Sequence, residues 1–381
     1  MGPGRAPTHA RHHLDVELEA PLRVRFSPDI FRAQTYGGVS RYLTELHRGL
    51  LARGIDSRIL AWLHINAYLR GLPGTVGLDI AKVRPIRARQ AVTKGTDRAL
   101  ERLWCTRQDR DTIWHKSMFD RRVPDRPRLA VTVYDMIHER YPDQFGPRDV
   151  IPDSKRPWCE AADVVFAISA TTRQDLLERF GLPAEKVKVT HLGVSVVEPT
   201  PGPLPFSEAP WILYVGDRTK PYKNWKRVLD AVRALGSDGR LACFGSPASA
   251  DDLAAIEARG LTDRVRFIGG DDRDLARIYR AASVLVYPSL FEGFGLPPLE
   301  AMAHGCPVVA ARAGAIPEVV GDAAVLFEPT DPDALAAALE RVLADGDHVA
   351  ALRAAGRARA AMFTWDRTVA ATLDGYRMIS R

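Results

Sequence analysis

Cysteine is scarce in this chain, and its four cysteines lie far apart. Cys105, Cys159, Cys243 and Cys306 show no C-x-x-C spacing among the 381 residues, so the pattern indicates neither a disulfide framework nor a zinc site. Long hydrophobic runs are also missing. No stretch approaches the roughly 18 apolar residues of a membrane span, and the N-terminus lacks the apolar core of a secretory signal. The sequence therefore predicts a cytoplasmic protein that is at most peripheral to a membrane.

Several ligand-binding patterns are absent as well. The first strand-to-helix turn offers only Gly37-Gly38 where a dinucleotide oxidoreductase would carry Gly-x-Gly-x-x-Gly. No Gly-x4-Gly-Lys-Ser/Thr occurs, which excludes a P-loop NTPase. Histidine pairs with metal-ligand spacing are confined to residues 1–20, and Asp331-Pro332-Asp333 is better explained as a helix cap than as a metal-binding Asp-x-Asp. The sequence predicts no catalytic metal and no other cofactor.

The charge is basic overall but unevenly distributed. The net charge is +6; residues 1–200 carry 32 basic and 24 acidic side chains, whereas residues 201–381 carry 21 and 23. Much of the excess falls in 82–128, which reads either as a solvated helical surface or as a basic face for an anionic acceptor or a membrane. Few aromatic side chains interrupt that segment, so stacking on nucleic-acid bases is poorly supported.

Short β-branched runs alternate with helical patterns in both halves of the chain, which is typical of parallel, doubly wound sheets. Strands are expected at 211–215, 240–244 and 284–287 among others, a helical pattern begins at Ser40, and Ser169 is placed to cap the helix at 171–180. A proline-dense stretch without any period separates two such series. We therefore expect an α/β protein built from two tandem Rossmann-like domains. The predicted divisions are a disordered tail at 1–20, an N-terminal domain at 21–195, a linker at 196–210, a C-terminal domain at 211–361, and a helix at 362–381 that crosses back to the first domain.

Two segments of the second half look suited to an anionic, hydroxyl-bearing ligand. In 216–225 a strand ends at Gly216, and Arg218 and Lys223 precede a helix whose first N–H groups are unpaired. The alternative is a charged surface loop. In 291–300, Gly293 and Gly295 let the backbone approach a ligand, and a proline suits the first turn of a following helix.

Carboxylates flank this second segment. Glu292 lies just before the glycine turn, and Glu300 is expected on the first turn of the helix. Two such acceptors could bind hydroxyls, and hydroxyls together with phosphates describe a nucleotide sugar. A role in capping alone is plausible for Glu300 and weak for Glu292.

These residues resemble the retaining glycosyltransferases of family 4, which have the GT-B fold, and in particular their mannosyltransferase-like members. The resemblance covers most of residues 22–345. It rests on Glu292-x7-Glu300, on the cations before the helix, and on further segments at 37–42, 167–176, 187–194 and 292–310. The spaced glutamates in this setting are a strong signal, whereas either glycine loop alone is weak.

The resemblance implies metal-independent sugar transfer with retention of the anomeric configuration. By position, Arg218 and Lys223 would bind the diphosphate, Glu292 the donor sugar and Glu300 the ribose. Gly38 would approach the diphosphate from the other domain. Backbone groups would complete the donor site, namely those of Gly293, Phe294, Gly295 and Leu296, with Ile268 in the segment 266–269 that is similar to the family's nucleobase site.

One position departs from the family pattern. Many relatives have His-Asp after the strand at 129–133, whereas this chain has Tyr134-Asp135, with His138 three residues later. Tyrosine donates a hydrogen bond but is no base near neutral pH. The acceptor-side candidates are Tyr36, Arg41, Tyr134, Asp135 and His138, and a capping or loop histidine is an equal interpretation of His138.

The resulting hypothesis is a hexosyltransferase that uses a nucleotide-diphosphate sugar, with GDP-mannose as the best expectation. Its acceptor would be a glycan, a lipid-linked saccharide or a small metabolite. A UDP-sugar enzyme and a nucleotide-sugar 2-epimerase are the enzymatic alternatives, and a nucleic-acid-binding protein that uses 82–128 is the non-enzymatic one.

Overall fold

Two parallel sheets organise the protein. The structure, a computed structural model, describes residues 22–82, 111–119, 123, 128–146, 149, 151–199, 201–203, 210–236 and 239–380. The first sheet has the order β3-β2-β1-β4-β5-β6-β7. Its strands are β1 Arg23–Phe26, β2 Asp56–His64, β3 Thr75–Asp79, β4 Thr112–Lys116, β5 Leu129–Val133, β6 Val164–Ala167 and β7 Val187–Val189.

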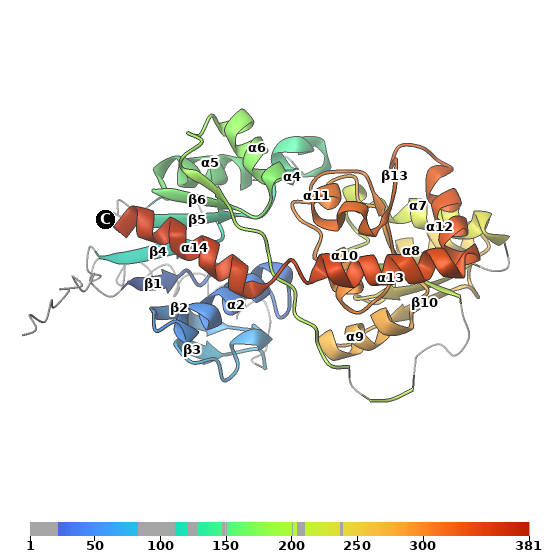
Figure 1. Cartoon of the computed structure of the whole chain (residues 1–381), viewed down its shortest axis with the longest axis horizontal. Helices are drawn as coiled ribbons and strands as arrows, with labels where there is room; N and C mark the ends of the chain where they lie inside the picture. The colour runs from blue at the N-terminus through green and yellow to red at the C-terminus, as the bar shows by residue number, and fades with distance from the viewer. Residues whose placement is uncertain are drawn as a thin grey trace, which may run out of the picture.

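The second sheet repeats this scheme in the order β10-β9-β8-β11-β12-β13, again with parallel pairing. Its strands are β8 Trp211–Val215, β9 Arg240–Phe244, β10 Val265–Ile268, β11 Val284–Tyr287, β12 Val308–Ala311 and β13 Val325–Phe327. The expected α/β class with two tandem Rossmann-like domains is confirmed. Figure 1 shows the two domains side by side, the first in blue to green and the second in yellow to red.

Helices cover the faces of both sheets. Those of the first domain are α1 Asp29–Ala33, α2 Gly38–Ala52, α4 Ile137–Arg140, α5 Ile151–Ala161 and α6 Ala170–Phe180, with short 3-10 helices η1 Ala67–Leu69 and η2 Pro142–Gln144. Those that follow are η3 Pro221–Lys223, α7 Trp225–Ala234, α8 Ala250–Glu257, α9 Asp272–Ala281, α10 Leu296–Ala303, α11 Ile316–Val320, η5 Gly321–Ala323, α12 Ala334–Ala344, α13 Gly346–Ala360 and α14 Trp365–Ser380.

Local sequence signals explain several helix ends. The Ser169 side chain accepts a hydrogen bond from the N–H of Thr172 and so caps α6, and Gly181 ends that helix with φ 68°. Helix α9 begins with a capping box between Asp271 and Asp274. The strands between the helices are largely buried runs, as expected where helices cover both faces of a parallel sheet.

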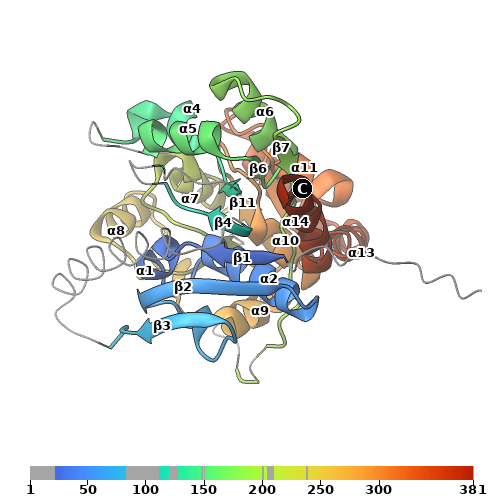
Figure 2. The ribbon, with the colours of Figure 1, turned by 90° about the vertical axis from the view of Figure 1, so that its left-hand side faces the viewer.

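The strand order places the site. In each sheet the order reverses beside the first strand, between β1 and β4 in one domain and between β8 and β11 in the other. Ligands of doubly wound sheets bind in the crevice outside the carboxyl ends of the strands at such a reversal. Seen from the first domain, β1, β2 and β3 lie side by side at the front, with helices of the second domain behind them (Figure 2).

The chain crosses between the domains twice at one place. Gly193 lies against the backbone of Trp365, so that a Cβ at residue 193 would come within 2.4 Å of the Trp365 nitrogen. Next to it, the N–H of Val194 donates to the carbonyl of Phe363 (3.0 Å). Helix α13 packs on α10 of the second domain, and α14 continues onto α2 and β6 of the first (Figure 1). The backbone is therefore closely packed where the chain passes between the domains.

Some predicted features lie outside the described residues. They are the tail at 1–20, most of the basic segment 82–128, and part of the linker at 196–210. Within the described parts of the chain, none of the helices combines the length and apolar character that crossing a bilayer requires.

Candidate functional site

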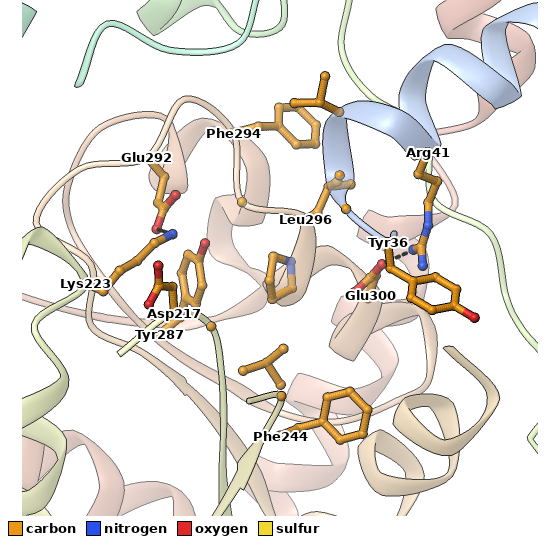
Figure 3. A pocket seen from close by; sticks show the side chains of 18 of the residues that line it. Tyr36, Arg41, Asp217, Lys223, Phe244, Tyr287, Glu292, Phe294, Leu296 and Glu300 are labelled. Atoms are coloured by element: carbon orange, nitrogen blue, oxygen red, sulfur yellow. Dashed lines mark hydrogen bonds and ion pairs between the residues drawn. The ribbon is translucent and has the colours of Figure 1, made fainter. Parts of the chain in front are cut away.

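A cavity of about 970 Å³ lies between the two domains, and all but two of the residues singled out from the sequence line it. Figure 3 shows its walls, with Lys223 and Glu292 on one side, Arg41 and Glu300 on another, and Phe244 on a third. The two exceptions are Ile268 and His138. Residues from distant parts of the chain therefore meet in one place, as a two-domain ligand site requires.

Lys223 and Glu292 form the first charged pair of the cavity. The Lys223 ammonium donates to Glu292 Oε1 at 2.7 Å, and both side chains keep contact with the cavity, at 16% and 11% exposure. The Lys223 nitrogen also lies near the ring centres of Tyr222 (5.3 Å) and Tyr287 (5.9 Å). Lysine has three donors, so Lys223 can bind an anion and Glu292 together.

Tyr287 is a functional neighbour that the sequence reasoning missed. It ends strand β11, is buried, and its hydroxyl hydrogen-bonds to Glu292. Burial, with the Glu292 charge nearby, raises the pKa of Tyr287 well above its usual value, so it remains a donor. Its place at the carboxyl end of a central strand was the signal available in the sequence.

Arg218 is oriented differently from Lys223. Its Nε donates to Asp252 Oδ2 (3.1 Å), and its Nη2 donates to the carbonyls of Ser246 (2.7 Å) and Pro247 (2.8 Å). The guanidinium lies over the Phe267 ring at 4.8 Å. Although Arg218 lines the cavity, these bonds fasten the loop at 245–249 to α8.

The glycine-rich loop brings the domains into close contact. Helix α10 begins at Leu296 after Gly295, whose φ is 124°, and prolines occupy its first turn as expected. A Cβ at Gly293 would lie 1.8 Å from the Tyr134 carbonyl oxygen of the other domain. A Cβ at Gly38 would lie 3.2 Å from the Leu296 side chain across the cleft. Glycine at 293 thus permits an approach that no other residue could make.

Glu300 lies in the second turn of α10, not in the first turn that we expected, because the helix begins at Leu296. Its Oε1 accepts from Arg41 of α2, and its Oε2 accepts from the Tyr279 hydroxyl at 3.2 Å. Burial raises the pKa of Glu300, and the Arg41 guanidinium acts in the opposite direction. These contacts make Glu300 part of the interface between the domains and not only a helix residue.

The residues after β5 meet the loop at 292–295. Burial raises the pKa of Tyr134 well above its usual value, so this phenol can donate but cannot serve as a base near neutral pH. Asp135 Oδ1 accepts from the N–H of Ile137 (3.1 Å), and Asp135 also lines the cavity. Tyr36 is half exposed at the cavity and packs edge-on against Tyr68.

His138 and Ile268 are placed away from the cavity. His138 stacks on Phe145 with ring centres 3.8 Å apart, and its Nδ1 bonds to Asp149 Oδ2 at 2.6 Å. His138 lies in the short helix α4, so it is not a loop histidine, and its contacts with Phe145 and Asp149 turn it away from the cavity. The Ile268 carbonyl accepts from the N–H of Gly245 (2.9 Å), and the segment that reaches the cavity on this side is 244–247.

The described residues hold no group of three or more His, Cys, Asp or Glu side chains placed to share a metal ion. Several charged groups of the cavity form ion pairs across short distances, as Lys223 does with Glu292 and Arg41 with Glu300.

Comparison with known proteins agrees with this geometry. Residues 36–198 match the model described as Glycosyltransferase Family 4, and residues 209–345 match that of Glycosyl transferases group 1. The chain belongs to glycosyltransferase family 4. The two matched regions contain the cavity residues of the two respective domains, including the spaced glutamates of the second. The protein is therefore a glycosyltransferase with the GT-B fold.

Its relatives include mannosyltransferases. The chain is 29% identical over 371 residues to the O-antigen chain mannosyltransferase B of Escherichia coli, which covers 90% of this chain and 96% of the relative. It is 34% identical over 223 residues to the MMP alpha-(1->4)-mannosyltransferase of Mycolicibacterium hassiacum, covering 56% of this chain and 53% of that protein.

A solved structure with the same fold is the sucrose-phosphate synthase of Thermosynechococcus elongatus. The TM-score is 0.73 at 22% identity, and the similarity covers 94% of this chain and 99% of that one. At this identity the likeness shows the fold alone.

Proposed function

We propose that this family 4 glycosyltransferase moves a mannosyl group from GDP-mannose to an acceptor hydroxyl, with retention of configuration and without a metal ion. The observation that carries the proposal is the pairing of Lys223 with Glu292 at a glycine turn that opens α10, opposite a second domain. Cation, backbone donors and carboxylates in one cavity suit a diphosphate joined to two sugars.

Lys223 is the proposed direct cation for the diphosphate. Charge accumulates on the diphosphate as it departs, and a fixed ammonium stabilises that charge. The N–H groups at the start of α10, including those of Gly295 and Leu296, would add hydrogen bonds and the positive end of the helix dipole. Arg218 lines the cavity and would add positive charge near the diphosphate, while its hydrogen bonds hold the loop at 245–249.

Glu292 is the proposed acceptor for hydroxyls of the donor sugar. Lys223 and Tyr287 both donate to its carboxylate, and together they fix its position beside the phosphate site. Glu300 is the proposed acceptor for the ribose hydroxyls. A carboxylate oxygen has two lone pairs, so each oxygen of Glu300 can still accept a hydroxyl beside its present partner.

The reaction itself needs no protein nucleophile. In the proposed front-face mechanism the bond between the anomeric carbon and the departing phosphate oxygen breaks, and the acceptor oxygen attacks on the same face. The acceptor proton passes to the departing phosphate. The protein supplies position and charge stabilisation, and closure of the two domains excludes water.

The mannosyl assignment is supported by the relatives with mannosyltransferase names, one of which covers nearly the whole chain. The proposed acceptor is a hydroxyl group of a glycan, of a lipid-linked saccharide or of a small metabolite. Loops of the first domain would select it, since that domain forms the wall opposite the donor residues.

A nucleotide screen tests the donor. A ligand at 100-fold over its Kd adds about 2.7 kcal/mol to the stability of the native state, which raises the melting temperature. We expect GDP to raise the melting temperature, and UDP, ADP and TDP to raise it less. Lys223→Ala should reduce the GDP effect. A larger shift with UDP would replace the GDP-mannose proposal by a UDP-sugar donor, and no shift with any of the four would refute a nucleotide-sugar site.

A transfer assay then tests the chemistry. Purified enzyme with GDP-mannose and a panel of carbohydrate acceptors should release GDP, and NMR of the product should show the α-anomer retained. Inversion at the anomeric carbon would refute the front-face mechanism. Unchanged turnover after treatment with EDTA is the expected result for metal independence.

A further inference from the structure

Arg41 connects the two domains through the carboxylate that we assign to the ribose. It lies in α2 of the first domain, and its guanidinium binds Glu300 through Nη1 and Asp272 Oδ2 through Nη2 (2.5 Å). Glu300 belongs to α10 and Asp272 to α9, both in the second domain. Figure 3 shows Arg41 and Glu300 next to each other at one side of the cavity, joined by a dashed line. One arginine thus bridges two carboxylates of the opposite domain.

Tyr68 completes this arrangement. Its hydroxyl accepts from Arg41 Nε (3.3 Å) and Nη2 (3.1 Å) and donates to Asp272 Oδ2 (3.2 Å). The Arg41 guanidinium also lies 5.6 Å from the centre of the Tyr68 ring. With partners on several sides, the guanidinium has little freedom to turn toward another ligand.

The Glu300 carboxylate is held between donors and still faces the cavity. Arg41 binds one of its oxygens and the Tyr279 hydroxyl the other. The side chains of Arg41 and Glu300 are 19% and 14% exposed, and both line the cavity. A carboxylate fixed in this way presents its remaining lone pairs in one direction, as a pair of neighbouring ribose hydroxyls requires.

We infer that Arg41 is a positioning residue of the donor site, which fixes Glu300 for the ribose and makes nucleotide binding depend on closure of the first domain. This inference rests on the proposed function. It moves Arg41 from the acceptor side, where the sequence had placed it, to the donor side. It also links domain closure to nucleotide binding. The Glu300 carboxylate is held in place only when the first domain, which carries Arg41, is in contact with the second.

The opposite arrangement makes the opposite prediction. If Arg41 merely occupied Glu300 until the nucleotide displaced it, removing Arg41 would raise nucleotide affinity. If Arg41 positions Glu300, removing it lowers nucleotide affinity. The direction of the change in Kd therefore separates the two.

The experiment is calorimetric titration of GDP, and of UDP in parallel, into wild type and variants of the full chain. Arg41→Met should weaken binding at least about tenfold, because it leaves the Glu300 carboxylate without its charged donor. The nucleotide affinity of Arg41→Lys should lie between those of wild type and Arg41→Met, since an ammonium lacks the forked guanidinium geometry that binds two carboxylates at once. Arg48→Met is the matched control, because Arg48 lies on the same helix, is half exposed and pairs with Glu45 on the surface.

The pH dependence of Kd provides a readout that a merely structural role would not change. Among the described residues, Arg41 from α2, Asp272 and Tyr279 from α9 are the groups that act on Glu300, with Tyr68 beyond Asp272. Without Arg41 the pKa of Glu300 rises further. The loss of affinity on acidification should therefore begin at higher pH in Arg41→Met than in wild type.

The outcomes separate this inference from the proposed function. If wild type binds neither nucleotide, the proposed function and this inference both fail. If wild type binds and Arg41→Met binds equally or more tightly, the proposed function stands and this inference is overturned. If Arg41→Met lowers nucleotide affinity by the same factor at every pH, this inference is likewise overturned. Thermal unfolding monitors the fold, and should Arg41→Met fail to fold, Arg41→Lys carries the same comparison.

Discussion

Gly293→Ala is the substitution for which the structure predicts the largest effect from the smallest change. The added methyl would lie 1.8 Å from the Tyr134 carbonyl oxygen and 2.8 Å from Asp135 Cβ, both in the opposite domain. Real Cβ contacts essentially never fall below 3.0 Å, so the two surfaces must separate by about 1.2 Å. The nearest atom belongs to the backbone and cannot turn aside as a flexible side chain can.

The expected loss of catalytic rate follows from this separation of the two domains. A misplacement of about 1 Å between groups that must act together lowers rates on the order of 100-fold. The three atoms nearest to the added methyl all belong to the first domain, so the second domain should fold normally. We expect kcat/KM for sugar transfer to fall about 100-fold while the melting temperature of the ligand-free protein stays close to that of wild type.

Three measurements check this prediction. Steady-state kinetics give kcat/KM, thermal unfolding gives stability, and small-angle scattering with saturating nucleotide reports whether the domains close. Scattering should show a compact state for wild type and a more open one for the variant. Gly346→Ala is the control, because a Cβ there meets nothing within 4 Å; it should keep wild-type turnover and gain about 0.4–1 kcal/mol at most.

Turnover within about threefold of wild type would refute the reasoning, since it would mean that the close contact at Gly293 is not part of the catalytic state. A large fall in melting temperature would refute it as well, because the loss would then come from a destabilised loop and not from separated domains.

Three further predictions follow from the same structure. Lys223→Ala and Glu292→Ala should each lower kcat by about 100-fold or more with the fold intact, since both are proposed to act at the reacting centre, and near-normal transfer by Lys223→Ala would contradict the diphosphate assignment. Tyr287→Phe should lower kcat/KM about tenfold through loss of a hydrogen bond to the charged Glu292, with kinetics as the test. Burial lowers the pKa of His115 to about 3, so the unfolded chain binds the proton first on acidification. Wild-type stability should fall as pH drops from about 6.5 toward 3, and His115→Gln should show a shallower fall in urea titrations at several pH values.

Much of the fold could be predicted because its signals are local. The runs at 211–215, 240–244 and 284–287 are short and largely apolar, and each is a strand with the bounds that the sequence indicated. Ser169 caps its helix as expected. The expected start of α2 at Ser40 was late by two residues, because Gly38 itself is helical. Helix α1 was missed, since its five residues are too few to show a period.

The candidate site was predicted as a set of residues, but their partners were not. The spacing of Glu292 and Glu300 and the cation at Lys223 identified the cavity from the sequence. The direction in which a side chain points leaves no comparable pattern in the sequence. Arg218 and Lys223 both precede α7, yet Arg218 turns to Asp252 and the loop at 245–249, whereas Lys223 turns to Glu292.

By itself, therefore, the sequence determined the two-domain α/β organisation, the family and the chemical types gathered at the cavity, because periodicity, capping and motif spacing act over short stretches of chain. Only the tertiary structure decided which charges pair. Arg41 and Glu300 are 259 positions apart and meet because two separate sheets bring their carboxyl edges to one cleft. Contacts of that separation depend on how whole domains pack, and no local pattern encodes them.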